Sequence, residues 1–140
     1  MRKKIQVIAM FFALVSVLFA GCKKEPNPQV AIVGKWVFSS IQAKSWENGV
    51  FKGEIYPYME AGTTMEFKGD NTWLITTVSL SDGGSYSIIG NKIKIKSEQG
   101  ETESEIAFPN NKTLKLSSIV ERTSDGITYR NEYISEYVRK

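Results

Sequence analysis

The chain has 140 residues, with 18 lysines and arginines, 15 aspartates and glutamates, a single cysteine and no histidine. The commonest general base and the usual zinc ligands are therefore missing, so the composition predicts no enzyme, no metal site and no cofactor. Three of the basic residues are Arg2, Lys3 and Lys4, which leaves the rest of the chain balanced in charge, without the basic patch that nucleic acid requires.

The first 22 residues have the pattern of an export signal. Arg2-Lys3-Lys4 precedes an apolar run from Ile5 to Phe19, and Leu18-Phe19-Ala20-Gly21-Cys22 ends it. An ordinary secretory signal and a membrane helix are alternatives, although the run is short for a membrane span. The small residues before the cysteine resemble the lipobox of bacterial lipoproteins. That resemblance implies that residues 1–21 are a cleaved signal peptide and that Cys22 becomes the lipidated N-terminus.

Lipidation would also account for the lone cysteine, which cannot form an intramolecular disulfide. No aspartate follows Cys22, and in enterobacterial lipoproteins that aspartate holds the protein at the inner membrane. The resemblance therefore implies the outer membrane of a cell envelope, with the domain facing the periplasm or the exterior. Residues 22–31 contain two prolines and predict an extended tether, and residues 32–140 are enough for one domain.

The centre of that domain, residues 63–96, reads as a meander of short strands. Apolar and polar residues alternate with a period of two, which is typical of strands that bury one face. The expected strands are residues 64–68, residues 73–78, a third around Tyr86 and Ile88, and residues 92–96. Turns are expected at residues 69–71, 81–84 and 90–91.

Three runs in register suggest a family. Gly34-Lys35-Trp36 begins the first strand, Phe67-Lys68-Gly69-Asp70-Asn71-Thr72 holds a turn, and Gly84-Ser85-Tyr86-Ser87-Ile88-Ile89-Gly90-Asn91 holds another. Together they resemble the lipocalins, and more closely the short lipocalin-like domains of bacterial lipoproteins, over about residues 33–138. The resemblance implies an all-β fold, an antiparallel up-and-down barrel of eight strands.

Residues 45–62 break the alternation and concentrate aromatic side chains. Asn48-Gly49 is a favoured hairpin turn, so an extra hairpin is one interpretation. We expect instead a long loop folded over the barrel mouth. A ninth strand in a closed up-and-down barrel would force the first and last strands to meet in parallel.

The remaining segment predicts the last strands of the barrel. Further turns are expected at residues 98–102, 109–111 and 123–126. The spacing of four between Tyr129, Tyr133 and Tyr137 also fits a helix face, but the β-branched and aromatic content of residues 128–139 favours a strand.

The turns divide the barrel into a tight end and a loose end. Turns at residues 69–71, 90–91 and 109–111 lie at one end, and the longer connections lie at the other, which predicts a closed end and an open mouth. Toward the mouth the inward residues become smaller and more polar, with Ser40, Gln42, Thr77, Ser104, Ser118, Tyr129 and Asn131 expected to face the lumen.

A lumen of this kind suits a small hydrophobic or amphipathic molecule. The candidate ligand-binding residues are Trp46, Phe51, Tyr56, Tyr58, Thr77, Tyr86, Tyr129, Asn131 and Tyr133. The alternative is a barrel packed solid, in a structural lipoprotein or one that binds another envelope protein.

The resemblance also implies how the closed end is sealed. Lipocalins place an arginine near the end of the last strand over the Gly-x-Trp indole, which here means Gly34, Trp36 and Arg139. Antiparallel closure brings Trp36 beside residues 137–139. Arg122 and Arg130 are alternatives that fall nearer the mouth.

Overall fold

The computed structural model describes residues 26–140, so the predicted signal peptide, Cys22 and the first residues of the tether lie outside the described residues. The described chain begins with one helical turn, α2 (Pro28–Ala31), which corrects the prediction of an extended tether there. Proline suits the first helical position, and the Asn27 side chain caps the turn by accepting a hydrogen bond from the Gln29 amide at 3.1 Å. No helix within residues 26–140 is long and apolar enough to cross a membrane.

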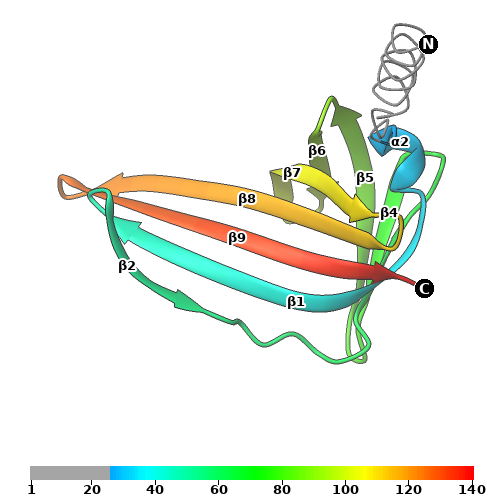
Figure 1. Ribbon diagram of the computed structural model, residues 1–140, viewed down its shortest axis with the longest axis horizontal. Coiled ribbons are helices and arrows are strands. Elements are labelled where there is room, and N and C mark those ends of the chain that lie inside the picture. The colour runs from blue at the N-terminus through cyan, green and yellow to red at the C-terminus, as the bar shows by residue number, and fades with distance from the viewer. Residues whose placement is uncertain (1–25) are drawn as a thin grey trace, which may run out of the picture.

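Nine antiparallel strands follow α2 (Figure 1). They are β1 (Gly34–Glu47), β2 (Val50–Ile55), β3 (Thr64–Phe67), β4 (Thr72–Thr76), β5 (Ser81–Ile89), β6 (Lys92–Ser97), β7 (Gly100–Asn110), β8 (Thr113–Ser124) and β9 (Ile127–Arg139). Strands β3 to β9 pair in sequence, and β1 pairs with both β3 and β9. This ring of eight confirms the predicted closed, up-and-down, all-β barrel.

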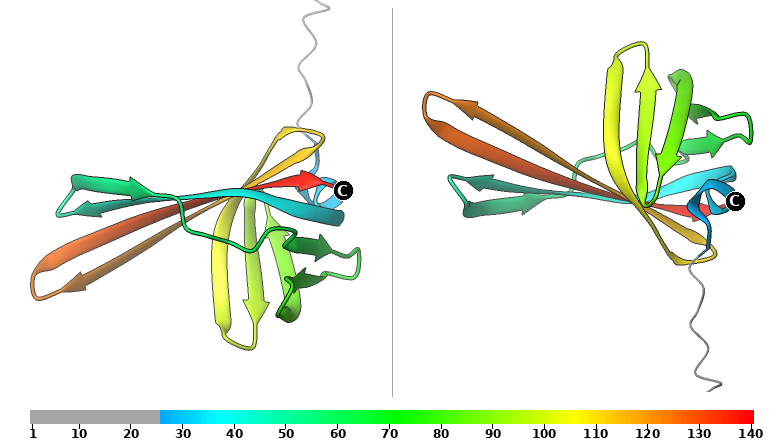
Figure 2. Two further views of the ribbon diagram at one scale, coloured as in Figure 1. Left: turned by 90° about the horizontal axis from the view of Figure 1, so that it is seen from below. Right: turned by 90° about the horizontal axis from the view of Figure 1, so that it is seen from above.

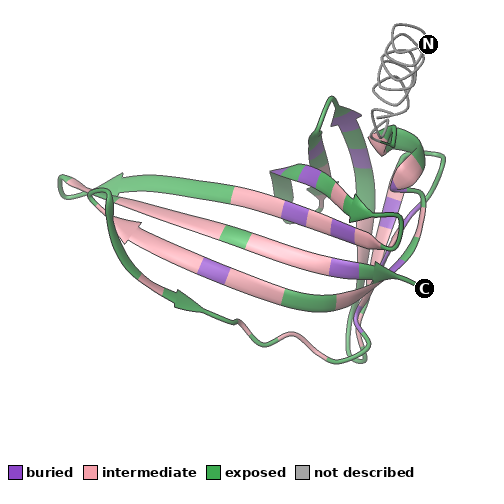
Figure 3. Ribbon diagram, viewed as in Figure 1, coloured by how far each residue is buried: buried purple, intermediate pink, exposed green. Residues whose placement is uncertain are grey.

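The core fills the end of the barrel where the turns after β3, β5 and β7 lie, which we call the closed end. Trp36, Phe67, Ile93 and Leu114 are completely buried there, and Figure 3 shows most other buried residues on the neighbouring strands. Across two of its tight turns, Phe67 pairs with Trp73 and Ile88 pairs with Ile93. Among the described residues, the strand ladders span residues 34–139 and the buried core spans residues 32–137.

Arg139 seals the closed end, as predicted. Its guanidinium carbon lies 4.4 Å from the centre of the Trp36 ring, and its Nη1 donates a hydrogen bond to the Val33 carbonyl at 3.2 Å. Nη2 donates to the carbonyl of Ala31, at the end of α2. Gly34 has φ of +135°, and a Cβ there would lie 3.0 Å from Nη1 of Arg139, so glycine is required for this approach.

The loop predicted for residues 45–62 is wrong over its first half, where the chain forms a hairpin. Asn48 and Gly49 both have positive φ, 48° and 79°, which is the backbone of a type I′ turn. The barrel keeps eight strands because β1 is long: its residues 34–37 pair with β3, and residues 43–47 of the same edge pair with β2. β2 therefore lies outside the ring.

The far halves of four strands extend beyond the barrel as a twisted sheet, which we call the arm. It consists of β2, residues 41–47 of β1, residues 118–124 of β8 and residues 127–134 of β9. Figures 1 and 2 show the β1–β2 and β8–β9 hairpins reaching together away from the C-terminus. The arm stands beside the mouth and does not cover it.

A β-bulge reverses the face of β1 that points inward. Phe38 pairs with Tyr137 but Ser40 pairs with Glu136, so Ser39 is the extra residue. Beyond it Ile41 and Ala43 lie opposite Ser135 and Tyr133, on the inward side of β9. The prediction that Ser40 and Gln42 face the lumen is therefore wrong.

Several connections are shifted or shorter than predicted. The turn expected at residues 81–84 is the beginning of β5, and the chain reverses at residues 77–80 instead. The connections between β6 and β7 and between β8 and β9 shrink to residues 98–99 and 125–126. The β7–β8 turn lies at residues 111–112, because β7 continues through Pro109 with an irregular register.

The contacts of Arg139 predict its effect on stability. Replacing Arg139 by alanine should lower the free energy of unfolding by about 1–3 kcal/mol, because it removes a cation–π contact and two hydrogen bonds. Urea denaturation measures the change. Arg122→Ala is the control, since the Arg122 guanidinium lies 5.5 Å from the Tyr129 ring at the exposed arm tip. A loss of stability equal to that of the control would contradict a sealing role for Arg139.

Candidate functional site

The nine candidate ligand-binding residues do not gather in one place. Trp46 and Phe51 lie on the outer face of the arm, with ring centres 5.5 Å apart. The guanidinium of Arg130 lies 5.4 Å from the Trp46 ring centre, and its Nε is 3.8 Å from the Glu121 carboxylate. These cross-strand contacts hold the four strands of the arm together, so the aromatic pair has a structural role there.

Tyr129, Asn131 and Tyr133 share the opposite face of the arm, as the predicted alternation requires. Asn131 and Tyr133 border a shallow groove of about 110 Å³. Small residues form its floor, with Ala43, Ser45 and Gly53 on the neighbouring strands β1 and β2. Tyr129 lies farther out, at the tip, where Arg122 covers its ring.

The other candidates are separated from this face. Tyr56 donates a hydrogen bond to Glu54 at 2.5 Å, and Tyr58 is 89% exposed. The Thr77 hydroxyl organises the β4–β5 turn by accepting hydrogen bonds from the amides of residues 79 and 80.

Tyr86 belongs to the closed end. Its hydroxyl donates to the Lys68 carbonyl at 2.8 Å, and its ring packs edge-on against Phe67. Burial, with a further contribution from the charge of Asp70, raises the pKa of the Tyr86 phenol above its ordinary value, so the group remains a neutral hydrogen-bond donor. Tyr86 therefore seals the core and is not available to a ligand.

A cavity does open at the barrel mouth, and the sequence did not single out its residues as a site. It has a volume of about 350 Å³ and is lined by Trp73, Ile95, Ser97, Gln99, Gly100, Glu101 and Thr102. The ladder between β6 and β7 pairs Ile95 with Thr102 and Ser97 with Gly100. Since Ile93 on the same strand is buried in the lumen, this alternation also turns Ile95 and Ser97 inward.

The floor of this cavity is held rigidly. Trp73 is only 7% exposed, and its indole nitrogen donates to the Lys96 carbonyl at 3.1 Å, so the side chain reaches from β4 across β5 to β6. A Cβ on Gly84 would lie 3.2 Å from that nitrogen and would collide with the Lys96 carbonyl. This close approach explains why the Gly83-Gly84 pair lies within a strand and is not a turn.

The rim of the cavity supplies hydrogen-bonding groups. Ser97 and Thr102 carry hydroxyls and Gln99 carries an amide, whereas the Glu101 carboxylate is 3.1 Å from Lys94. Among residues 26–140 no three Asp, Glu, Cys or His side chains lie close enough to hold a metal ion. The arrangement suits non-covalent binding, with an apolar group on Trp73 and Ile95 and polar groups at the rim.

Comparisons with known proteins add little to this site. No protein-family model matches the chain, and no curated protein matches it. Among solved structures, the chain is similar to a de novo designed fluorescence-activating β-barrel, with 15% identity and a TM-score of 0.41 over 81% of this chain and 98% of that one. So distant a likeness carries no argument about function.

The close packing at Gly84 predicts a selective effect of substitution. Gly84→Ala should destabilise the fold by about 1–3 kcal/mol and shift the Trp73 indole N–H resonance, because the added methyl group displaces the Lys96 carbonyl. Urea denaturation and NMR measure the two effects. Gly69→Ala is the control, since a Cβ there would meet nothing within 4 Å. An unshifted resonance in the Gly84 variant would mean that the floor is not constrained as described.

Proposed function

We propose that this protein is a lipid-anchored component of a bacterial cell envelope that binds a small amphipathic molecule at the barrel mouth. The observation that carries this proposal is the mouth cavity, whose aromatic and aliphatic floor lies beneath a rim of hydroxyl and amide groups. The closed barrel itself is compatible with a ligand-binding, calycin-like fold.

The size of the cavity limits the ligand. Its volume of about 350 Å³ is near the lower end of the range for small-molecule sites, roughly 300–1,000 Å³. The closed end is filled by side chains, so a long acyl chain could not extend down the lumen. The geometry therefore favours a compact molecule with one flat apolar part that rests on Trp73.

The position of the tether supports the same function. The described chain begins at the closed end, where the Gln29 side chain donates to the Ile88 carbonyl at 3.4 Å. A lipid on Cys22 would therefore hold the closed end toward the membrane and leave the mouth open to the surrounding solution.

A protein-binding role is the second candidate, and the arm favours it. β7 pairs with β8 only as far as Ser117, so the outer edge of residues 118–124 is unpaired within the described chain. Ile119 and Val120 on this edge are about half exposed. An unpaired strand edge can accept a strand from another protein, and this mode of binding needs no open lumen.

The lipid anchor is tested by fatty-acid labelling. Cys22→Ser should abolish the labelling of the full chain and move the protein to the soluble fraction, because the thioether cannot form. Labelling that persists in the variant would contradict lipidation at Cys22. Unlabelled parent protein would contradict it as well.

The ligand is tested by native mass spectrometry of protein purified from cell envelopes. We expect a bound mass on the parent protein that is lost in Thr102→Trp, because the indole would occupy the cavity. Thr128→Trp, on the outer face of the arm, is the matched control and should retain the bound mass. A bare mass for the parent protein would contradict the proposed function and favour the protein-binding candidate. Retention of the ligand in Thr102→Trp would contradict the assignment to this cavity.

A further inference from the structure

Charge is distributed unevenly between the two ends of the barrel. The segments that form the closed end are residues 26–35, 68–71, 90–91, 111–112 and 139–140. They contain Lys35, Lys68, Lys112, Arg139 and Lys140 against a single acid, Asp70. The connections at the opposite end, residues 48–49, 56–63, 77–80, 98–99 and 125–126, contain Glu60, Glu98 and Asp125 and no base. Residues 26–140 are nearly neutral overall, with 13 basic and 14 acidic residues, but their closed end is cationic.

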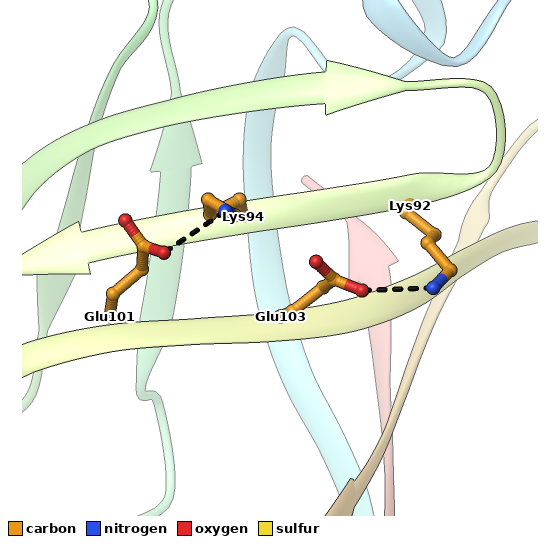
Figure 4. Close-up of polar contacts among 4 residues, drawn as sticks. All are labelled: Lys92, Lys94, Glu101 and Glu103. Carbon is orange, nitrogen blue, oxygen red and sulfur yellow. Dashed lines mark hydrogen bonds and ion pairs between the residues drawn. The ribbon is translucent and has the colours of Figure 1, made fainter.

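The cations of the closed end are not neutralised by ion pairs within residues 26–140. The ion pairs there lie on the arm and on the barrel wall, where Lys92 faces Glu103 and Lys94 faces Glu101 (Figure 4). Glu66 lies opposite Lys35 in the β1–β3 ladder without forming a salt bridge. Asp70 is engaged with Thr72, whose hydroxyl and amide donate to it at 2.6 and 3.0 Å.

Exposed apolar side chains lie at the same end of the barrel. Val30 on α2 is 72% exposed and Ile89, beside the β5–β6 turn, is 82% exposed. The hydrogen bond from Gln29 to the Ile88 carbonyl holds the two neighbouring segments together. A hollow of about 390 Å³ lies at the same end, bordered by Pro26, Pro28, Asn91, Ile106, Ala107, Phe108 and Pro109.

We infer that the closed end is a docking surface for an anionic lipid bilayer. Unpaired lysines are attracted to acidic headgroups, and exposed aliphatic side chains gain by entering the interface between headgroups and acyl chains. The start of the described chain favours a bilayer as the occupant. Pro26 borders the hollow and lies four residues after Cys22, a reach of at most about 14 Å. The inference rests on the proposed lipid anchor, which would bring the closed end to a membrane. The positive charge and the exposed apolar side chains of this end are observed independently of that anchor.

The test uses residues 22–140 with Cys22→Ser, which retain the described strand ladders and buried core but cannot be lipidated. Cosedimentation with vesicles of phosphatidylcholine, with and without about a quarter phosphatidylglycerol, measures docking alone. We expect binding that requires phosphatidylglycerol and falls with added salt. Lys68→Gln with Lys112→Gln should weaken it about 25-fold, at about fivefold for each lysine.

Matched variants at the other end of the molecule complete the test. Lys44→Gln with Lys96→Gln removes the same number of positive charges as the first pair, one on the arm and one near the mouth. This variant should leave binding unchanged. Ile89→Asn should weaken binding, whereas Val78→Asn, at a mouth residue that is 88% exposed, should not. Binding that is indifferent to phosphatidylglycerol, or equal losses at the two ends, would overturn the inference. Fatty-acid labelling of Cys22 tests the anchor separately, so the two ideas can fail independently.

Discussion

The contact between Arg139 and Trp36 seals the floor of the barrel, because it joins the first and last strands at the point where the ring closes. The indole is completely buried, donates to the Ile32 carbonyl at 2.7 Å, and is covered by the guanidinium. The same guanidinium donates to carbonyls at residues 31 and 33, so one side chain connects α2, β1 and β9. Removing the guanidinium would uncover the buried indole at the β1–β9 seam.

Unequal strand lengths explain the rest of the architecture. β1, β8 and β9 have 14, 12 and 13 residues, whereas β3 and β4 have 4 and 5. Strands can pair around a closed ring only over the length that all of them share. The remaining residues of the long strands therefore extend beyond the barrel and pair with one another as the arm. β2 then covers the edge of β1 that β3 is too short to reach. The shared part is shallow, which is why large side chains fill it and the remaining cavity lies at the mouth.

Local patterns were enough to predict the ring and its seal. Alternation located the strands that carry Phe67 and Trp73, and the Gly-x-Trp resemblance located the partner of Arg139. The features that were missed depend on contacts between distant residues. No local signal marks Ser39 as a bulge, although it reverses the face of β1. In the sequence, Gly83-Gly84 predicts a turn. In the fold the pair lies within β5, because the Trp73 indole and the Lys96 carbonyl occupy the space that side chains would need. The candidate ligand residues were chosen mainly for aromatic character, and the hairpin places two of them, Trp46 and Phe51, on the outer face of the arm.

The two ends of the barrel differ in charge, and this difference would orient the proposed contact with a bilayer. Mobile ions screen charges beyond about 8 Å at physiological ionic strength, so a bilayer interacts mainly with the end that touches it. Contact through the closed end places five basic residues against the headgroups, whereas contact through the opposite end would place Glu60, Glu98 and Asp125 there. Attraction at one end and repulsion at the other favour the same orientation as a lipid on Cys22. In that orientation the cavity on Trp73 and the free edge of β8 both point away from the membrane, where a ligand or a partner can reach them.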